Sequence, residues 1–156
     1  MANDKQYKIK TKYIGTRGVD EFRATIAEWV KPDDVILEIG CEWGTTSVLI
    51  AEKCKNLVAT DVSSECIERA KKTYPGIRFE TLDIYDIKAA MALNMKFTKI
   101  YVDVSGFSGY RSLLDVLSVL NMYASVFEPE AIIIKSGAIK QFARNLVAWE
   151  SKITNE

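Results

Sequence analysis

The stretch VILEIGCEWGTT, which runs from Val35 to Thr46, decides the fold of this chain. Its first five residues form a short apolar run, which predicts a buried strand. Gly40 and Gly44 then indicate a turn, and the residues from Thr45 to Lys53 predict a helix. A strand, a glycine turn and a helix form the first unit of a nucleotide-binding α/β sheet. The backbone amides of such a turn face whatever lies above the carboxyl end of the strand.

The residues of this turn favour S-adenosylmethionine over a dinucleotide. Glu42 stands where a dinucleotide-binding turn has its second glycine, and a carboxylate there would repel a diphosphate such as that of NAD. S-adenosylmethionine has no phosphate; it carries a sulfonium cation, an α-amino group and one carboxylate. Glu38, just before the first glycine, could order the turn and hold the amino-acid end. The alternative is a glycine turn in some other α/β protein.

The composition favours one globular domain. The chain has 156 residues, and its hydrophobic share of 48% is ordinary for a protein with a sizeable core. The sequence has 21 Lys and Arg residues and 21 Asp and Glu residues, which gives a formal net charge of zero. The overall charge therefore does not indicate nucleic-acid binding, and only a local basic patch would be compatible with it. The absence of histidine removes the commonest general base and zinc ligand.

The cysteines and the apolar runs indicate where in the cell the protein is expected. Cys41, Cys54 and Cys66 lack the spacing of a metal site, so we interpret them as reduced thiols. No apolar run reaches the length of a membrane span, and the polar N-terminus does not resemble a signal peptide. We therefore expect a soluble, cytoplasmic protein with no metal site and no membrane partner.

Residues 1–18 are expected to form an arm ahead of a single domain at residues 19–156. Lysines alternate with other side chains between Tyr7 and Tyr13, and this period of two indicates an extended segment with one basic face. The segment could be a flap that contacts an anionic substrate. A solvated arm, or a short edge strand protected by lysines, fits the pattern better.

Helical and strand patterns alternate from Val19 to Lys135. We expect strands at 35–39, 57–60, 77–82, 99–103 and 131–134, a helix at 19–30, helices between the strands, and a last helix at 138–153. In the last helix, Ile139, Phe142, Leu146 and Trp149 should face inward. The fold class is therefore α/β: a Rossmann-like parallel sheet of about five strands with helices on both faces.

Acidic residues follow three of the expected strands. Asp61 lies about twenty residues past Gly40, where a carboxylate can accept hydrogen bonds from the hydroxyls of a ribose. Its alternative role, a helix N-cap, fits Ser63 or Ser64 better. Asp103 ends a central strand, where open α/β sheets place their chemistry, and the loop at 104–109 is long enough to shape a substrate pocket.

The pattern Glu-x-Gly-x-x-x-Gly at residues 38–44 resembles motif I of the class I S-adenosylmethionine-dependent methyltransferases. In that superfamily an acidic residue after the third strand commonly receives the adenine amino group. Asp83 matches that position, with Ile84 able to supply a backbone amide, although Asp83 could merely turn the chain. The resemblance implies S-adenosylmethionine as the cofactor. The expected cofactor-binding residues are Glu38, Gly40, Cys41, Gly44, Thr45, Thr46, Asp61, Val62, Asp83 and Ile84.

Three pieces look like fibrillarin, an RNA ribose methyltransferase of this superfamily. Residues 40–46 resemble its Gly-x-x-x-Gly-Thr-Thr turn, residues 102–105 its Asp-Val-Ala, and residues 133–136 its Ile-Lys-Ala. The resemblance implies methyl transfer to a hydroxyl of an RNA ribose or a small molecule, with Asp103 and Lys135 facing the acceptor. The glutamine-bearing loop of fibrillarin is replaced here by Gly-Phe-Ser-Gly at residues 106–109.

A hydroxyl acceptor must lose its proton during the reaction. Because the chain has no histidine, Lys135 beside Asp103 is the available catalytic pair, since burial can lower the pKa of a lysine. In the alternative arrangement Lys135 reaches solvent and Asp103 touches the methionine end of the cofactor. The alternative function is an S-adenosylmethionine-binding protein that acts in a complex with little or no catalysis.

Class I methyltransferases usually add two more strands after the last helix expected here. Residues 151–156 are too few to form them. We therefore expect a sheet without that strand pair, whose fifth strand is left uncovered. An uncovered edge invites pairing, so a homodimer through it is possible.

Overall fold

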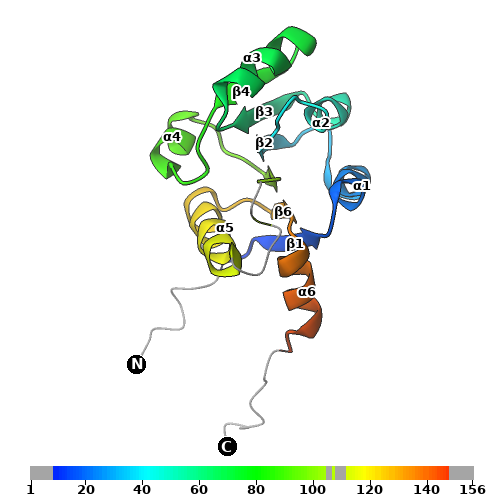
Figure 1. Ribbon diagram of the computed structural model, residues 1–156, viewed down its shortest axis with the longest axis vertical. Helices are drawn as coiled ribbons and strands as arrows, with labels where there is room; N and C mark the ends of the chain where they lie inside the picture. Colours follow the sequence, from blue (N-terminus) through cyan, green and yellow to red (C-terminus); the bar gives the residue numbers. More distant parts are fainter. Residues whose placement is uncertain (1–8, 105–106, 108–111, 148–156) are drawn as a thin grey trace, which may run out of the picture.

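The computed structural model describes residues 9–104, 107 and 112–147. It contains a six-stranded parallel sheet with helices on both faces (Figure 1). The strands are β1 (Lys12–Thr16), β2 (Val35–Ile39), β3 (Asn56–Asp61), β4 (Arg78–Thr81), β5 (Lys99–Val102) and β6 (Ala131–Lys135). The helices are α1 (Val19–Trp29), α2 (Ser47–Lys53), α3 (Ser64–Thr73), α4 (Ile87–Ala92), α5 (Leu113–Phe127) and α6 (Gly137–Asn145).

The strand order is β1-β6-β5-β2-β3-β4, and every neighbouring pair is parallel. Parallel neighbours need a connection that crosses back over the sheet, and helices supply it here. Strands β2, β5 and β6 lie inside the sheet with almost all of their side chains buried. Burial on both faces is why they appear in the sequence as continuous apolar runs. The prediction of a Rossmann-like α/β fold is confirmed.

Side chains from the strands alternate between two hydrophobic layers. In β6, Ile132 and Ile134 join one layer with apolar residues of α4 and α5, whereas Ala131 and Ile133 join the other with residues of α1, α2 and α3. Figure 1 shows α4 and α5 on one side of the strands and α1 and α2 on the other. The two layers hold the sheet so that the carboxyl ends of all six strands lie at one edge.

The first strand lies in the segment that we expected to be an arm. Lys12–Thr16 pair in parallel with Ala131–Lys135, and the Thr11 hydroxyl donates a hydrogen bond of 2.7 Å to the carbonyl of Pro129. The sheet therefore has six strands rather than about five. Tyr7 and Lys8 lie outside the described residues. Of the alternating lysines only Lys12 lies in β1, and Lys10 precedes it. The segment thus contains the short edge strand that we gave as one alternative, with one side of its backbone unpaired.

The edge of β6 is covered by β1, so our reason for expecting a homodimer is removed. We inferred a partner from an open edge at the last strand of the sheet. Instead, Lys12–Thr16 occupy that edge along the whole length of β6. The backbone groups of β6 are thus paired within the chain on both sides.

The last helix is shorter than expected. We predicted a helix to Ile153, but α6 ends at Asn145 and Leu146 is extended. The prediction that Phe142 and Leu146 face inward is wrong, since they are 42% and 63% exposed. Only the first turn of α6, which includes Ile139, packs on the sheet. Trp149 and Ile153 lie outside the described residues.

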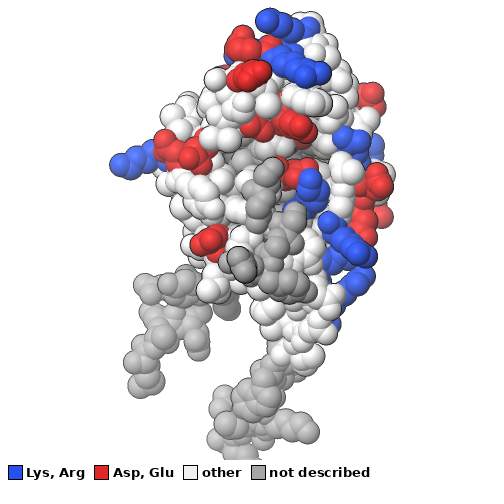
Figure 2. Space-filling view, viewed as in Figure 1, with Lys and Arg blue, Asp and Glu red and all other residues white. Residues whose placement is uncertain are grey.

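Charged side chains are mixed over the surface. On the described part of the face drawn in Figure 2, red and blue groups alternate, and neither colour fills a broad area. This agrees with the formal net charge of zero. Among the described residues, no helix has both the length and the apolar character that crossing a bilayer requires.

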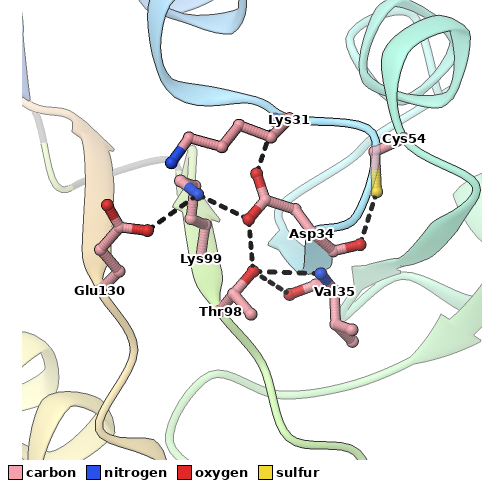
Figure 3. Close-up of polar contacts among 7 residues, drawn as sticks. All are labelled: Lys31, Asp34, Val35, Cys54, Thr98, Lys99 and Glu130. Carbon is pink, nitrogen blue, oxygen red and sulfur yellow. Dashed lines mark hydrogen bonds and ion pairs between the residues drawn. The ribbon is translucent and has the colours of Figure 1, made fainter.

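A buried ion pair ties together the amino ends of the central strands (Figure 3). The Lys99 side chain is 1% exposed, and its Nζ lies 2.6 Å from Asp34 Oδ1 and 3.2 Å from Glu130 Oε2. The Thr98 hydroxyl donates to the same Asp34 oxygen at 2.8 Å. Burial raises the pKa of Asp34, but Lys99 and the hydrogen bonds outweigh it and hold the pKa below its usual value. This network fixes the end of the sheet opposite to the candidate site.

Candidate active site

A cleft of about 510 Å³ lies above the carboxyl ends of the strands. This volume falls within the roughly 300–1,000 Å³ typical of small-molecule sites. Five of the ten expected cofactor-binding residues line the cleft, as do both expected catalytic residues. They are Gly40, Asp61, Val62, Asp83, Ile84, Asp103 and Lys135. The structure therefore brings together residues that come from the ends of β2, β3, β4, β5 and β6.

The first glycine of the turn lies hard against the end of β5. Gly40 has φ +85°, and a Cβ atom there would lie 1.9 Å from the carbonyl oxygen of Asp103. The amides of Gly40 and Cys41 both donate to the carbonyl of Thr60, at 2.7 and 2.9 Å. Only glycine fits this close approach of two strand ends, and the bare backbone forms part of the floor of the cleft.

The second glycine serves packing. Gly44 has φ +82°, and a Cβ atom there would lie 3.0 Å from the ring of Phe79 and 3.1 Å from that of Tyr74. Gly44 does not line the cleft. Its role in this structure is to let the turn pack on α3 and β4.

Glu42 lines the cleft, although we used it only to argue against NAD. Its φ of +49° lies in the left-handed region, which is uncommon for a residue with a side chain. The amide of Glu42 donates a hydrogen bond of 2.9 Å to Asp61 Oδ2. The turn is therefore joined to the end of β3 through this strained residue.

Asp61 ends β3 and accepts a hydrogen bond on each carboxylate oxygen. Oδ2 accepts from the amide of Glu42, and Oδ1 accepts from the amide of Ser63 at 2.9 Å. Ser63 caps α3, because its hydroxyl accepts from the amide of Cys66. The carboxylate is thus held in one orientation, with further lone pairs available to a ligand hydroxyl. Val62, beside it, is 68% exposed and also lines the cleft.

The segment after β4 forms the far end of the cleft. Asp83 Oδ1 accepts from the amide of Tyr85 at 2.9 Å, whereas Asp86 caps α4 by accepting from the amide of Ala89. Tyr85 is 58% exposed and meets the ring of Phe107 edge-on, with centroids 6.5 Å apart. We did not predict Tyr85 as a site residue. The sequence signal that could have indicated Tyr85 is its position directly after Asp83 and Ile84, two expected site residues.

Asp103 and Lys135 form an ion pair at the other end of the cleft. They follow neighbouring strands, and Lys135 Nζ lies 2.5 Å from Asp103 Oδ1. Their side chains are 20% and 26% exposed, so the pair is largely shielded from water. The amide of Asp103 donates to the carbonyl of Ile39 at 2.9 Å, which keeps Asp103 beside the glycine turn.

The other expected residues do not line the cleft, but they belong to the turn or contact it. Glu38 is 1% exposed and accepts a 2.5 Å hydrogen bond from the Ser47 hydroxyl. Burial raises the pKa of Glu38 to about 7, although the Ser47 hydrogen bond acts in the opposite direction. Cys41 is 4% exposed, and burial raises the pKa of its thiol. Thr45 and Thr46 accept hydrogen bonds from Arg23 of α1, at 2.9 and 3.1 Å.

The loop that we expected to shape a substrate pocket is described only in part. Residues 105–106 and 108–109 lie outside the described residues. Phe107 is 3% exposed and packs in the core, and its carbonyl accepts a hydrogen bond of 2.5 Å from the Ser136 hydroxyl. Within the part of the chain that the structure describes, no three acidic, cysteine or histidine residues come close enough to hold a metal ion.

Comparison with known proteins finds similarity to methyltransferases. Residues 36–112 match a family described as a methyltransferase domain. The probable cobalt-precorrin-6B C(15)-methyltransferase (decarboxylating) of Methanococcus vannielii is 29% identical over 107 residues, which make up 66% of this chain and 58% of the relative. Ribosomal RNA small subunit methyltransferase A of Malacoplasma penetrans is 31% identical over 61 residues, 38% of this chain and 22% of the relative.

Solved structures share the fold. A dimethyladenosine transferase from Plasmodium falciparum aligns with a TM-score of 0.60 and 20% identity, over 85% of this chain and 46% of that chain. The chain thus spans less than two thirds of the length of each of these three proteins.

Proposed function

We propose that this chain is a class I S-adenosylmethionine-dependent methyltransferase that transfers a methyl group to a hydroxyl of an RNA ribose or a small molecule, a proposal supported by the match of residues 36–112 to a methyltransferase domain. The observation that carries this proposal is the Asp103–Lys135 pair, held at 2.5 Å at one end of the cleft. The relatives are named for methyl transfer to carbon and to ribosomal RNA. The acceptor atom is therefore the point that experiment must decide.

The cleft fits the cofactor of this superfamily. When bound, S-adenosylmethionine supplies an electrophilic methyl group on its sulfonium. Asp61 would accept hydrogen bonds from the ribose hydroxyls, and Asp83 with the amide of Ile84 would receive the adenine. Gly40 leaves the backbone bare beside Asp103, so the amino-acid end can lie close to the turn. In this arrangement the protein contributes mainly by alignment of donor and acceptor.

A hydroxyl must lose its proton as it attacks a methyl group, and in this proposal Asp103 and Lys135 serve that step. Both lie at the end of the cleft away from Asp83, and both are largely shielded from water. In the ion pair Lys135 is an ammonium, whose N–H groups would hold the acceptor oxygen, whereas the carboxylate of Asp103 would accept the hydroxyl proton. Asp103 orients Lys135 through the ion pair, so the loss of either residue should impair transfer.

The first experiment is calorimetric titration with S-adenosylhomocysteine, with NAD as the control ligand. We expect micromolar binding of the first and none of the second. Methyl transfer from labelled S-adenosylmethionine is then measured with RNA and with small hydroxyl compounds as acceptors. Lys135→Ala should abolish transfer and leave the affinity for S-adenosylhomocysteine nearly unchanged.

Two results would contradict this proposal. Transfer that survives in Lys135→Ala would show that the catalytic assignment is wrong. Binding without transfer to any acceptor would favour a cofactor-binding protein that has little catalysis of its own.

A further inference from the structure

Tyr85 lies at the mouth of the cleft. It is 58% exposed, whereas Leu82 and Ile84 of the same segment line the cleft at only 3% and 5% exposed. Among the described residues that line the cleft, Tyr85 is the only aromatic one. Its ring therefore lies nearer to solvent than the buried apolar residues beside it.

The Tyr85 side chain is held at its backbone and at its ring. Its amide donates to Asp83 Oδ1 at 2.9 Å, which fixes the chain where it leaves β4. Its ring meets that of Phe107 edge-on, with an angle of 79° between the planes. Phe107 is buried in the core, so it gives the exposed ring a fixed support. The rest of the Tyr85 ring remains accessible to a ligand.

The contact with Phe107 directs Tyr85 toward the end of the cleft that holds the Asp103–Lys135 pair. Phe107 comes shortly after Asp103 in the chain, and its carbonyl accepts a hydrogen bond from the hydroxyl of Ser136, the residue after Lys135. Phe107 is therefore anchored beside the ends of β5 and β6. The ring of Tyr85 begins at the β4 end of the cleft and rests on this anchored residue.

An accessible tyrosine ring at the mouth of a cleft suits a ligand that is itself flat. Aromatic side chains stack on nucleobases and on other planar rings, and they do so without regard to the pattern of hydrogen-bonding groups. The adenine of the cofactor would lie deeper, against Asp83 and Ile84. The ring that meets Tyr85 at the mouth would then belong to the second ligand, which is the methyl acceptor.

We propose that Tyr85 stacks on a flat ring of the methyl acceptor and so brings the acceptor hydroxyl to Asp103 and Lys135, an assignment that rests on the proposed function. Tyr85 is then a residue that determines specificity. The acceptor is a compound whose hydroxyl lies close to a planar ring. A nucleoside of RNA and a small phenol share this chemistry, and an aliphatic alcohol lacks it.

The test uses the chain saturated with S-adenosylhomocysteine, so that the adenine site is filled, and two matched pairs of probes. The first pair is 2-naphthol and decahydro-2-naphthol, which has the same carbon skeleton but no flat ring. The second pair is uridine and methyl β-D-ribofuranoside, which lacks the base. Calorimetric titration measures the affinity for each probe. A preference within the first pair indicates a small phenol as the acceptor, and a preference within the second indicates RNA.

The wild-type chain should bind at least one flat probe about fivefold or more tightly than its partner in the pair, as expected for one stacked ring. Tyr85→Ala should abolish this preference. Tyr85→Phe should retain it, because stacking uses the ring and not the hydroxyl.

Two controls separate this role from a structural one. Tyr85→Ala should leave the affinity for S-adenosylhomocysteine within about twofold of the wild-type value, since that ligand would rest on Asp83 and Ile84. Tyr13→Ala removes an exposed tyrosine of β1 that does not line the cleft, and it should change neither measurement. Thermal melting of each variant shows that the chain is folded.

Three results would overturn the assignment. The first is equal affinity for the two members of both pairs in the wild-type chain, and the second is no binding of any probe to the loaded chain. The third is a loss of S-adenosylhomocysteine affinity in Tyr85→Ala as large as the loss for the flat probe, because Tyr85 would then belong to the cofactor site. Failure of the wild-type chain to bind S-adenosylhomocysteine would instead overturn the proposed function, so the first titration distinguishes the two failures.

Discussion

Individual acidic side chains of the cleft are held in place by hydrogen bonds from the backbone around it. Asp61 accepts hydrogen bonds from two amides and Asp83 from one, so each carboxylate is oriented before any ligand arrives. Lys135 orients Asp103 in the same way. Because the side chains are fixed by local contacts, binding requires little further ordering. The effect of single substitutions should therefore be large in the cleft and small outside it.

Asp61→Ala should weaken binding of S-adenosylhomocysteine about tenfold or more, because a ligand ribose would lose its acceptor and two amides would lose theirs. Calorimetric titration measures the change. The matched control is Asp86→Ala, which removes a cap from α4 but does not touch the cleft. Unchanged affinity in Asp61→Ala would exclude the ribose role.

Tyr123→Phe should raise the free energy of unfolding by up to about 1 kcal/mol. The Tyr123 side chain is 2% exposed, and its hydroxyl has no hydrogen-bond partner among the described residues. The control is Tyr101→Phe, since the Tyr101 hydroxyl accepts from Thr25 at 3.2 Å and its removal should be destabilising. Urea unfolding compares the two, and a loss of stability in Tyr123→Phe would mean that its hydroxyl is bonded in solution.

Among the helices and strands, those buried on both faces were predictable and those at the margins were not. The expected strand at 35–39 matches β2, the expected strands at 99–103 and 131–134 differ from β5 and β6 by one residue at one end, and β3 is one residue longer at each end than expected. Continuous apolar runs mark such strands in any sequence. Strand β1 is largely exposed, so its pattern fits a solvated arm as well as an edge strand. The apolar period on which the last expected helix was based continues past Asn145, where α6 ends, and Leu146 is 63% exposed.

The same distinction applies to the cleft. Asp61, Asp83 and Asp103 could be placed in advance, because the carboxyl ends of parallel strands meet at one edge of the sheet. Glu42 could not. It reaches the cleft through a left-handed backbone conformation, which leaves no periodic signal in the sequence.

Gly40→Ala should lower the free energy of unfolding by about 3 kcal/mol and abolish binding of S-adenosylhomocysteine. The added methyl group would collide with the carbonyl of Asp103 and push β2 and β5 apart. Gly76→Ala is the control, because nothing lies within 4 Å of its would-be Cβ atom. Equal stability of the two variants in urea would show that the close approach at Gly40 is not rigid.

Two buried acids, Asp34 and Glu38, make the free energy of unfolding of the whole molecule depend on pH in opposite directions. The pKa of Asp34 is held below its usual value in the folded chain, so its contribution is lost as the pH falls through that lowered pKa. The pKa of Glu38 is raised from 4.5 to about 7, so folding favours its protonated form. Its contribution is present below 4.5 and is lost as the pH rises to about 7.

In the wild-type chain, the folding equilibrium constant should therefore fall about tenfold or more between pH 5 and pH 7 because Glu38 ionises. Glu38→Gln should remove this part of the decline. The amide keeps a hydrogen-bond acceptor for Ser47 but cannot ionise. Urea unfolding at several pH values measures the slope in both chains. A wild-type chain that is equally stable at both ends of this range would show that the carboxyl of Glu38 ionises in the fold without cost.

The pairing of β1 with β6 has a consequence for how the chain is made. The hydrogen bond between Thr11 and Pro129 joins residues 118 positions apart. During synthesis, the first strand leaves the ribosome long before its only neighbour in the described sheet exists. It must wait while the four intervening strands and their helices assemble, and it docks only after residues 131–135 have emerged. Closure of so long a loop is entropically slow, so β1 should be among the last elements to reach its place.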